Sequence, residues 1–310
     1  MTGELTLGPG AEFDAVRAML AEWGPTAVGI GDDAAVLQLA RGDVLVASVD
    51  TAVEGRHFER GWLSAHDVGY RAVAAALSDL AAMAARPVGI LVAMSVPDAW
   101  RASIVDIAGG IGDAVKRAGT TIRGGNLASG GELSITTTVL GVAFTVLSRA
   151  GARVGDRVYV TGRLGAPAAA LELLRLGRSA GQFHDRFARP EPRLAEARWL
   201  AREGASAAID ISDGLVSDAG HLAAASGVCV SIDAARVPLV EGVSLEVGLG
   251  SGEEYELLVT TPDRFDSNEF ANRFGIPLTE IGRVGDGHAG TVEVSGARVA
   301  RHAGHDHFSG

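Results

Sequence analysis

The chain has 310 residues, 47% hydrophobic and 21% charged, which is enough apolar material for one large or two ordinary folded domains. Its formal net charge of -11 argues against nucleic acid as the main partner, because a phosphate backbone favours a basic surface. Cys229 is the single cysteine, so an internal disulfide is excluded and a reducing, cytoplasmic location is expected. The N-terminus does not resemble a signal peptide, and no apolar run is long enough to predict a membrane span.

Elements of the first half are predicted from apolar periodicity and from glycine and proline positions. An alanine-rich stretch predicts a long helix that ends before Pro87. The helices expected here span residues 11–23, 65–84 and 98–117. The strands expected here span residues 43–49, 88–96 and 132–147, the last of them long and either bent or paired. Residues 122–132 are expected to form a glycine-rich loop.

A glycine-rich polar segment at residues 148–156 predicts a domain boundary, giving domains 1–148 and 149–310. A new strand, RVYVTG, follows it. Further helices are expected near residues 165–177, 190–203 and 214–226. Further strands are expected near residues 207–211, 228–233, 256–261, 278–283 and 290–299. Alternating helices and strands in both halves predict an α/β fold.

Six aspartates lie near predicted strand ends and turns, or inside an apolar helix. They are Asp32, Asp33, Asp50, Asp79, Asp210 and Asp213. Carboxylates gathered at one place repel each other and resist desolvation, so they stay in water or bind a cation. Oxygen ligands favour Mg2+, Mn2+ or Ca2+. If the fold brings these residues together, the pattern indicates phosphate chemistry.

Taken singly, most of these aspartates have an ordinary structural explanation. A surface turn accounts for Asp32 and Asp33, a turn or helix cap for Asp50, and a helix cap for Asp213. Asp79 differs, because an acid inside the apolar helical stretch AAALSDLAAM needs a partner or a ligand. A helix cap does not explain Asp210.

Three other segments suggest anion binding, and several enzyme classes find little support. The Gly124-Gly125 pair suits either anion binding by backbone N–H groups or a tight turn. The start of the helix expected at 214–226 is suited to bind a phosphate, while GSGEEYELLVT also suits a charged turn.

The histidines lack zinc-site spacing, GxSxG is absent, and Cys229 lies in an apolar strand. Lys116, the only lysine among 27 basic residues, lies outside any P-loop or VAIK motif, so metal ions and arginines must neutralise a bound nucleotide.

Taken in order, several segments resemble those of thiamine-monophosphate kinases: GIGDDAAVL, VDTAVEGRHF, LSDLAAM, LSRAGARVGDRVYVTG, RPEPR, IDISDGLVSDAGHLA, GEEYELL and HDHF. That family belongs to a superfamily of ATP-binding proteins with aminoimidazole ribonucleotide synthetase. The resemblance implies a two-domain fold of this type, α/β in the broad sense and of the α+β kind, and a homodimer formed through the N-terminal sheets. It also implies direct in-line transfer of the γ-phosphoryl group of ATP to thiamine monophosphate, with several Mg2+ ions.

The resemblance assigns site residues by position, and it implies no acid, base or nucleophile among the side chains. The implied metal ligands are Asp33, Ser48, the backbone carbonyl of Val49, Asp50, Asp79, Asn126, Asp210 and Asp213. The implied ATP contacts are Gly125, Asn126, Arg149 and Ser212. The implied contacts to thiamine monophosphate are His57, Glu253 and His305. A strong general base is not needed, because the acceptor phosphate is already an anionic nucleophile.

The chain departs from the family pattern at four positions. Asn126 replaces the aspartate of GGD, Ala76 replaces an asparagine, and Ser251 and Glu254 replace glycine and aspartate in GGEDYEL. Asn126 keeps an oxygen ligand but loses a charge, so weaker Mg2+ binding or slower turnover is expected.

Two alternative functions stay open. One is another ATP-using synthetase of the superfamily, although the reactive cysteines of selenophosphate synthetase and of the hydrogenase-maturation factor have no counterpart here. The other is a nucleotide-binding protein that has lost turnover. Asn126 favours this second alternative, and retention of the other metal-ligand positions argues against it.

Overall fold

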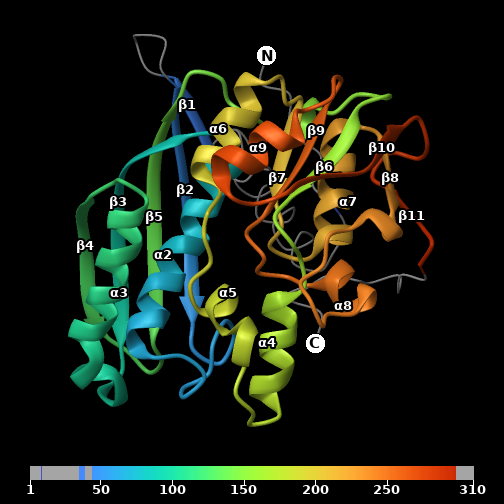
Figure 1. Ribbon diagram of the computed structural model, residues 1–310. Helices are drawn as coiled ribbons and strands as arrows, with labels where there is room; N and C mark the ends of the chain where they lie inside the picture. Colours follow the sequence, from blue (N-terminus) through green and yellow to red (C-terminus); the bar gives the residue numbers. More distant parts are fainter. Residues whose placement is uncertain (1–7, 9–34, 39–43, 298–310) are drawn as a thin grey trace.

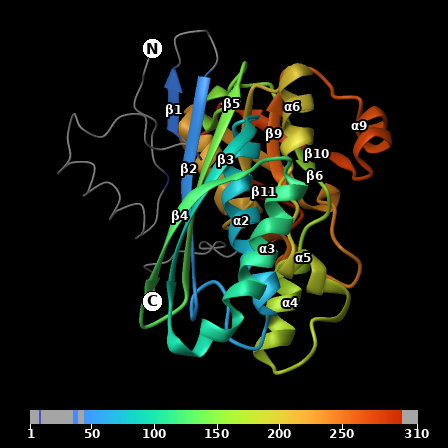
Figure 2. The same ribbon diagram turned by 90° about the vertical axis from the view of Figure 1, so that its left-hand side faces the viewer.

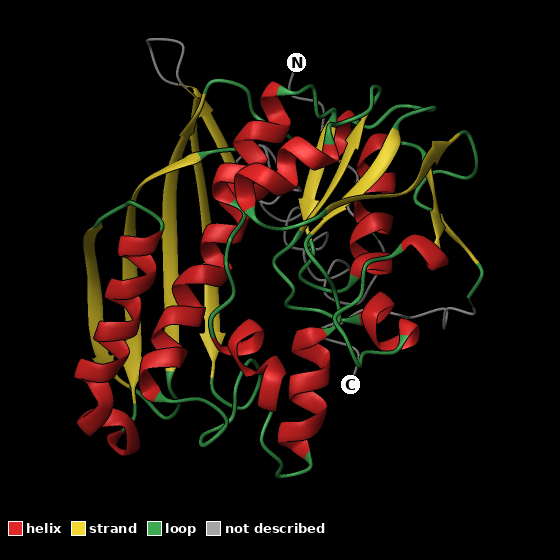
Figure 3. Ribbon diagram, in the orientation of Figure 1, coloured by secondary structure: helices red, strands yellow, loops and turns green. Residues whose placement is uncertain are grey.

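The computed structural model describes Gly8, residues 35–38 and residues 44–297. The helix expected over 11–23 and the candidate residues Asp32, Asp33 and His305 lie outside these described residues. The described chain forms two β-sheets, each with helices packed against it (Figures 1 and 3). The expected two-domain α/β architecture is confirmed.

The first sheet has the strand order β1-β2-β5-β3-β4, in which only the pair β3–β4 is parallel. Its strands are β1 (Ala35–Gln38), β2 (Val44–Val53), β3 (Arg86–Val96), β4 (Ile122–Ser129) and β5 (Ser134–Ala143). Alternate residues of β5 are fully buried, among them Ile135, Thr137 and Val139. This period of two places one face of the sheet against the helices and leaves the other face without a described helix (Figure 2).

Helices α2 (Ala65–Ala82) and α3 (Ile104–Arg117) cover the first sheet. α2 begins where the Ser64 hydroxyl accepts the N–H of Asp67 at 3.1 Å, and its alanines favour helix. The two helices pack backbone to backbone through Gly69 and Gly110. A Cβ atom at either glycine would overlap a backbone oxygen of the facing helix, so larger residues would force the helices apart.

The second sheet has the order β11-β8-β10-β6-β9-β7, in which only β8 and β11 are parallel. Its strands are β6 (Arg157–Thr161), β7 (Ala207–Asp210), β8 (Cys229–Asp233), β9 (Leu257–Thr261), β10 (Leu278–Gly285) and β11 (Val292–Ser295). Its helices are α4 (Ala166–Arg175), α5 (His184–Ala188), α6 (Leu194–Arg202), α7 (Leu215–Ser226), α8 (Leu245–Gly250) and α9 (Ser267–Phe274).

A continuous hydrophobic core joins the two domains. It runs from the first sheet through α2 and α6 to one face of the second sheet, and includes Leu77, Trp199 and Val259. A second core lies under α7 and includes Leu215 and Ile232. Because α2 packs on both β2 and β7, the ends of these strands are held beside each other.

Three sequence expectations are corrected by the structure. β2 continues past residue 49, since its pairing with β5 extends to Val53, so Asp50 lies inside the strand and not at its end. The expected loop at 122–132 is wrong, because residues 122–129 form β4, an exposed edge strand paired with β3. The helix expected over 98–117 begins with a 3-10 segment at Asp98–Ser103 before α3.

The other described helices and strands expected from sequence are present, with ends shifted by a few residues. β5 is the long paired strand, bonded to both β2 and β3. The short helices α5, α8 and α9 and the strand β1 were not predicted. In the part of the chain that the structure describes, no helix has both the length and the apolar character to span a bilayer.

Candidate active site

A cleft of about 660 Å³ is lined by both domains and is called here the interdomain cleft. The first domain contributes Asp50 of β2, Asp79 of α2 and the segment 55–59. The second contributes the turn that follows β7 and the loop before β9. The cleft therefore forms where β2, α2 and β7 meet around the shared core.

Among the residues that the structure describes, the acidic groups of the cleft outnumber its arginines. Its carboxylates are Asp50, Glu59, Asp79, Asp210, Asp213 and Glu253, and its arginines are Arg56 and Arg175. Such a surplus of negative charge in a partly enclosed site favours bound cations. Hydroxyl and carboxylate oxygens form the donor set around the aspartates, and hard divalent ions such as Mg2+ prefer these ligands. The residues present therefore fit a magnesium site.

Two serine hydroxyls orient two of the aspartates. The Ser48 hydroxyl on β2 donates to Asp79 Oδ2 at 2.5 Å. The Ser78 hydroxyl, fully buried on α2, donates to Asp210 Oδ2 at 2.7 Å. The second bond crosses from the first domain to the second, so α2 sets the geometry of a carboxylate that the other domain supplies.

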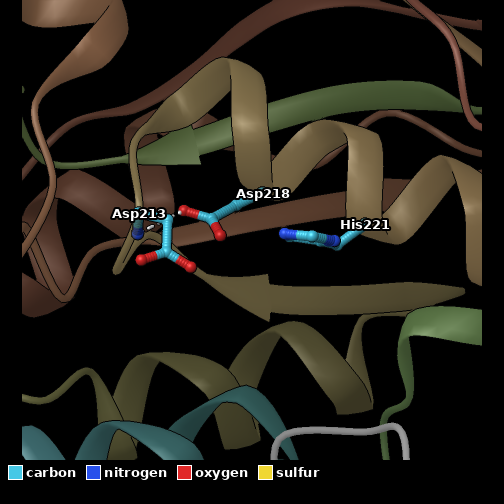
Figure 4. A group of neighbouring side chains, drawn as sticks. All are labelled: Asp213, Asp218 and His221. Atoms are coloured by element: carbon cyan, nitrogen blue, oxygen red, sulfur yellow. Dashed lines mark hydrogen bonds between the residues drawn. The ribbon is translucent and has the colours of Figure 1, made fainter. Parts of the chain in front are cut away.

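The turn at residues 210–214, called here the aspartate turn, connects β7 to α7. Its backbone N–H groups at Ser212, Asp213 and Gly214 all donate to Asp218 Oδ2, at 3.0, 3.0 and 3.1 Å. Asp218 is fully buried, and burial together with the Asp213 and Asp210 carboxylates raises its pKa well above the usual range. Figure 4 shows Asp218 in the first turns of α7, between Asp213 and His221.

The loop before β9 holds Glu253 against the aspartate turn. Its backbone N–H donates to the oxygen of Ser212 at 2.7 Å, and the N–H of Tyr255 donates to the oxygen of Ile211 at 2.9 Å. Glu253 and Tyr255 have φ angles of 57° and 53°, which are strained for residues with side chains. Strained backbone of this kind persists only where surrounding contacts impose it, and it is frequent at functional sites.

Arg71 of α2 fixes the Glu253 side chain from the first domain. Its guanidinium lies 2.5 Å from Glu253 Oε2, is 3% exposed, and lies over the Phe187 ring at 4.3 Å from the centroid. Burial alone would lower the pKa of Arg71, but Glu253 and neighbouring groups outweigh it and raise that pKa. Arg71 therefore stays charged and ties α2 to the loop.

Glu254 and Glu256 are buried outside the cleft. Burial would raise the pKa of Glu256, but Arg193 and Arg186 outweigh it and hold that pKa at about 2. The closest contact is between Arg193 Nη2 and Glu256 Oε1, at 2.5 Å. Glu254 has less compensation, and burial raises its pKa to about 7. Glu256 thus stabilises the fold beneath the loop.

The structure brings most of the described candidate residues to one cleft and places others elsewhere. Those that line the cleft are Val49, Asp50, His57, Asp79, Asp210, Ser212, Asp213 and Glu253. Ser48 contacts Asp79 directly. Arg149 lies in a 3-10 helix beside α7, where its carbonyl accepts the Ser226 hydroxyl at 2.6 Å. Gly125 and Asn126 lie on β4, away from the residues that line the cleft.

Strand register places Gly125 and Asn126 on opposite faces of the first sheet. Gly125 continues a row through Val92 and Thr137 to Asp50, on the face that α2 covers. Asn126 is one residue further and belongs to the row through Ala93 and Thr136 on the opposite face. Its side chain therefore points away from Asp79 and α2.

Sequence reasoning missed Arg71, Asp218, Arg56 and Arg175. The signal for Arg71 is a charged residue inside an apolar, alanine-rich helix, which requires a buried partner. The signal for Asp218 is an aspartate in the first turn of a helix that starts at Gly214 without a serine, threonine or aspartate cap. The two cleft arginines have no local signal.

Comparison with known proteins gives one consistent family. Residues 31–143 match the AIR synthase related protein N-terminal domain, and residues 153–295 match its C-terminal domain. The chain is 34% identical to the thiamine-monophosphate kinase of Escherichia coli (strain K12), covering 96% of both chains.

Two solved structures are similar over nearly the whole chain. AaThiL complexed with AMPPCP and TMP has a TM-score of 0.86 at 31% identity, covering 96% of this chain and 97% of that one. Thiamine-monophosphate kinase from Stenotrophomonas maltophilia K279a has a TM-score of 0.77 at 34% identity, with 96% and 99% covered.

Proposed function

The chain belongs to the thiamine-monophosphate kinases of the AIR synthase related family, and we propose that it transfers the γ-phosphoryl group of ATP to thiamine monophosphate in the interdomain cleft. One observation carries this proposal: aspartates of both domains, Asp50 and Asp79 from the first and Asp210 and Asp213 from the second, line one cleft. Both reactants are polyanions, so charge neutralisation and positioning dominate the barrier.

The proposed metal ligands are the aspartates of the cleft, with Ser48 and the Val49 carbonyl beside them. Asp33 and Asn126 complete the set by resemblance, although Asn126 lies on the open face of the first sheet, in register with Ala93. These oxygens would hold Mg2+, which would supply positive charge to neutralise the phosphate groups of the two reactants. Hydrogen bonds from Ser48 and Ser78 orient the Asp79 and Asp210 carboxylates for this task.

The remaining candidate residues contact the two reactants in this proposal. Ser212, Arg149, Gly125 and Asn126 bind ATP, with Ser212 at the turn before α7. His57, Glu253 and His305 bind thiamine monophosphate. His57 is held by the N–H of Val53, which donates to its Nδ1 at 3.1 Å. In this proposal the Glu253 carboxylate, which is paired with Arg71, also faces the cationic thiazolium ring of the substrate.

We also propose a homodimer formed through the open face of the first sheet. Val49, Thr138 and Leu91 form one cross-strand row on this face, and Val49 and Leu91 are 62% and 39% exposed. Apolar side chains exposed on a sheet face are suited to bury themselves against a second copy.

Two further expectations complete the proposal. We place the domain boundary between residues 148 and 149, just before the 3-10 helix Arg149–Gly151. We place the protein in the cytoplasm, in keeping with Cys229, a buried free thiol.

The direct test is an assay with thiamine monophosphate, ATP and Mg2+, scored for thiamine diphosphate. Asp210→Asn removes a cleft charge and keeps the side-chain shape, so turnover should fall by about two orders of magnitude or more, since metal-assisted charge stabilisation is lost. Asp156→Asn is the matched control, because Asp156 is also buried but accepts the Arg153 N–H and the Ser206 hydroxyl outside the cleft. Equal activity of the two variants would refute the role of the cleft.

A further inference from the structure

We propose that Asp218 is a positioning residue that holds the aspartate turn in the geometry that binds the metal–nucleotide complex. This inference rests on the proposed function, because it assigns Asp218 a role toward Asp213 and Ser212. The observation behind it is one carboxylate oxygen, Asp218 Oδ2, that accepts three consecutive backbone N–H groups of the turn.

Asp218 satisfies the N–H groups of the turn that leads into α7. α7 begins after Gly214, which has a φ of 112° and offers no side chain to accept the N–H groups at the helix start. Unsatisfied N–H groups buried at a helix start are costly. Asp218, in the first turn of the helix, turns back to accept the N–H groups of residues 212–214, which lie just before the helix.

The carbonyl side of the same turn is held by other groups. The oxygens of Ile211 and Ser212 accept the N–H groups of Tyr255 and Glu253, at 2.9 and 2.7 Å. The aspartate turn is therefore fixed from both sides, with Asp218 on one and the loop before β9 on the other. Loss of Asp218 would free the N–H side only, which allows Asp213 to move relative to Asp210.

The two carboxylate oxygens of Asp218 differ in their hydrogen bonds. Ligand atoms of Asp213, Asp218 and His221 lie within 4.8 Å of one another (Figure 4). Asp218 Oδ1 is buried and has no hydrogen-bond partner among the described residues. A direct ligand role would depend on the charge at Oδ1, whereas the positioning role depends on an acceptor oxygen at Oδ2. Asparagine separates these roles, since its carbonyl keeps the acceptor and removes the charge.

The test compares Asp218→Asn, Asp218→Ala and the control Asp156→Ala, which removes a buried aspartate that accepts a backbone N–H away from the cleft. Binding of Mn2+ in the presence of a non-hydrolysable ATP analogue is followed by the electron paramagnetic resonance signal of the free ion. This readout needs no turnover, so it stays informative if the wild-type protein proves to act on another substrate. Thermal unfolding of each variant reports the structural loss separately.

We expect Asp218→Ala to weaken Mn2+ binding at least tenfold, with Asp218→Asn within about threefold of wild type, because the energy of the lost hydrogen bonds is large only in the alanine variant. Asp156→Ala should lower thermal stability and leave Mn2+ binding unchanged. The inference is overturned if Asp218→Ala binds Mn2+ like wild type, or if Asp218→Asn is as impaired as Asp218→Ala, which would make Asp218 a direct ligand.

Discussion

Replacement of Arg71 by methionine tests whether α2 controls the loop that carries Glu253. The substitution keeps an apolar stem and leaves the Glu253 carboxylate, 28% exposed, without its guanidinium partner. Removing one member of a buried ion pair costs about 3–5 kcal/mol, and the partial exposure of Glu253 places the loss near the lower end, at about 3 kcal/mol. We expect this loss in urea-induced unfolding, together with a raised KM for thiamine monophosphate.

The control is Arg101→Met, which breaks the Arg101–Asp98 pair on the surface of the first domain. Both side chains are exposed, at 63% and 89%, so this variant should lose no more than about 1 kcal/mol. A double variant, Arg71→Met with Glu253→Gln, should be less destabilised than the sum of the two single changes by about 2 kcal/mol. Strict additivity, or equal losses for Arg71→Met and Arg101→Met, would refute the coupling between α2 and the loop.

Three further predictions follow from buried charge, from the departure at Asn126 and from the open sheet face. The pKa of Glu256 is held at about 2, below its ordinary value of 4.5, so its stabilisation is present above pH 4.5 and is lost as the pH falls toward 2. Glu256→Gln should therefore lower stability by about 3 kcal/mol at neutral pH and flatten the acid limb of the stability profile; an unchanged acid limb in urea unfolding would contradict this. If residue 126 is a metal ligand, Asn126→Asp should tighten Mg2+ binding or raise turnover. An unchanged Mg2+-dependent rate would exclude that role. Leu91→Lys should convert the proposed dimer to a monomer in light scattering, while Val105→Lys, at an 80% exposed site on α3, should leave it intact; a dimeric Leu91→Lys variant would exclude this face.

Some elements were predictable because local signals and tertiary contacts agree. α2 combines alanine-rich periodicity with a capping serine, Ser64, so its propensity and its packing favour the same helix. β4 was missed because its glycines favour a loop locally, while its strand state depends on hydrogen bonds to β3, roughly thirty residues earlier.

The candidate site shows the same limit. Asp79 was predicted because it lies inside an apolar helix, where an unpaired acid is costly. Asp210 was predicted because it lies where a strand ends. Arg71 was not, since its partner Glu253 is distant in sequence and meets it only when the domains pack. Asp218 was not, because its side chain turns back to bind the turn before its own helix, a geometry that spacing alone does not distinguish from an ordinary helical aspartate.

The central claim is that this chain transfers the γ-phosphoryl group of ATP to thiamine monophosphate in the interdomain cleft. Its most direct test is a single-turnover reaction with ATP labelled at the γ-phosphate, thiamine monophosphate and Mg2+. We predict that the label appears in thiamine diphosphate with wild-type protein and Asp156→Asn, and fails to do so with Asp210→Asn. Label released only as inorganic phosphate, or transferred to thiamine monophosphate by Asp210→Asn at the wild-type rate, would contradict the account.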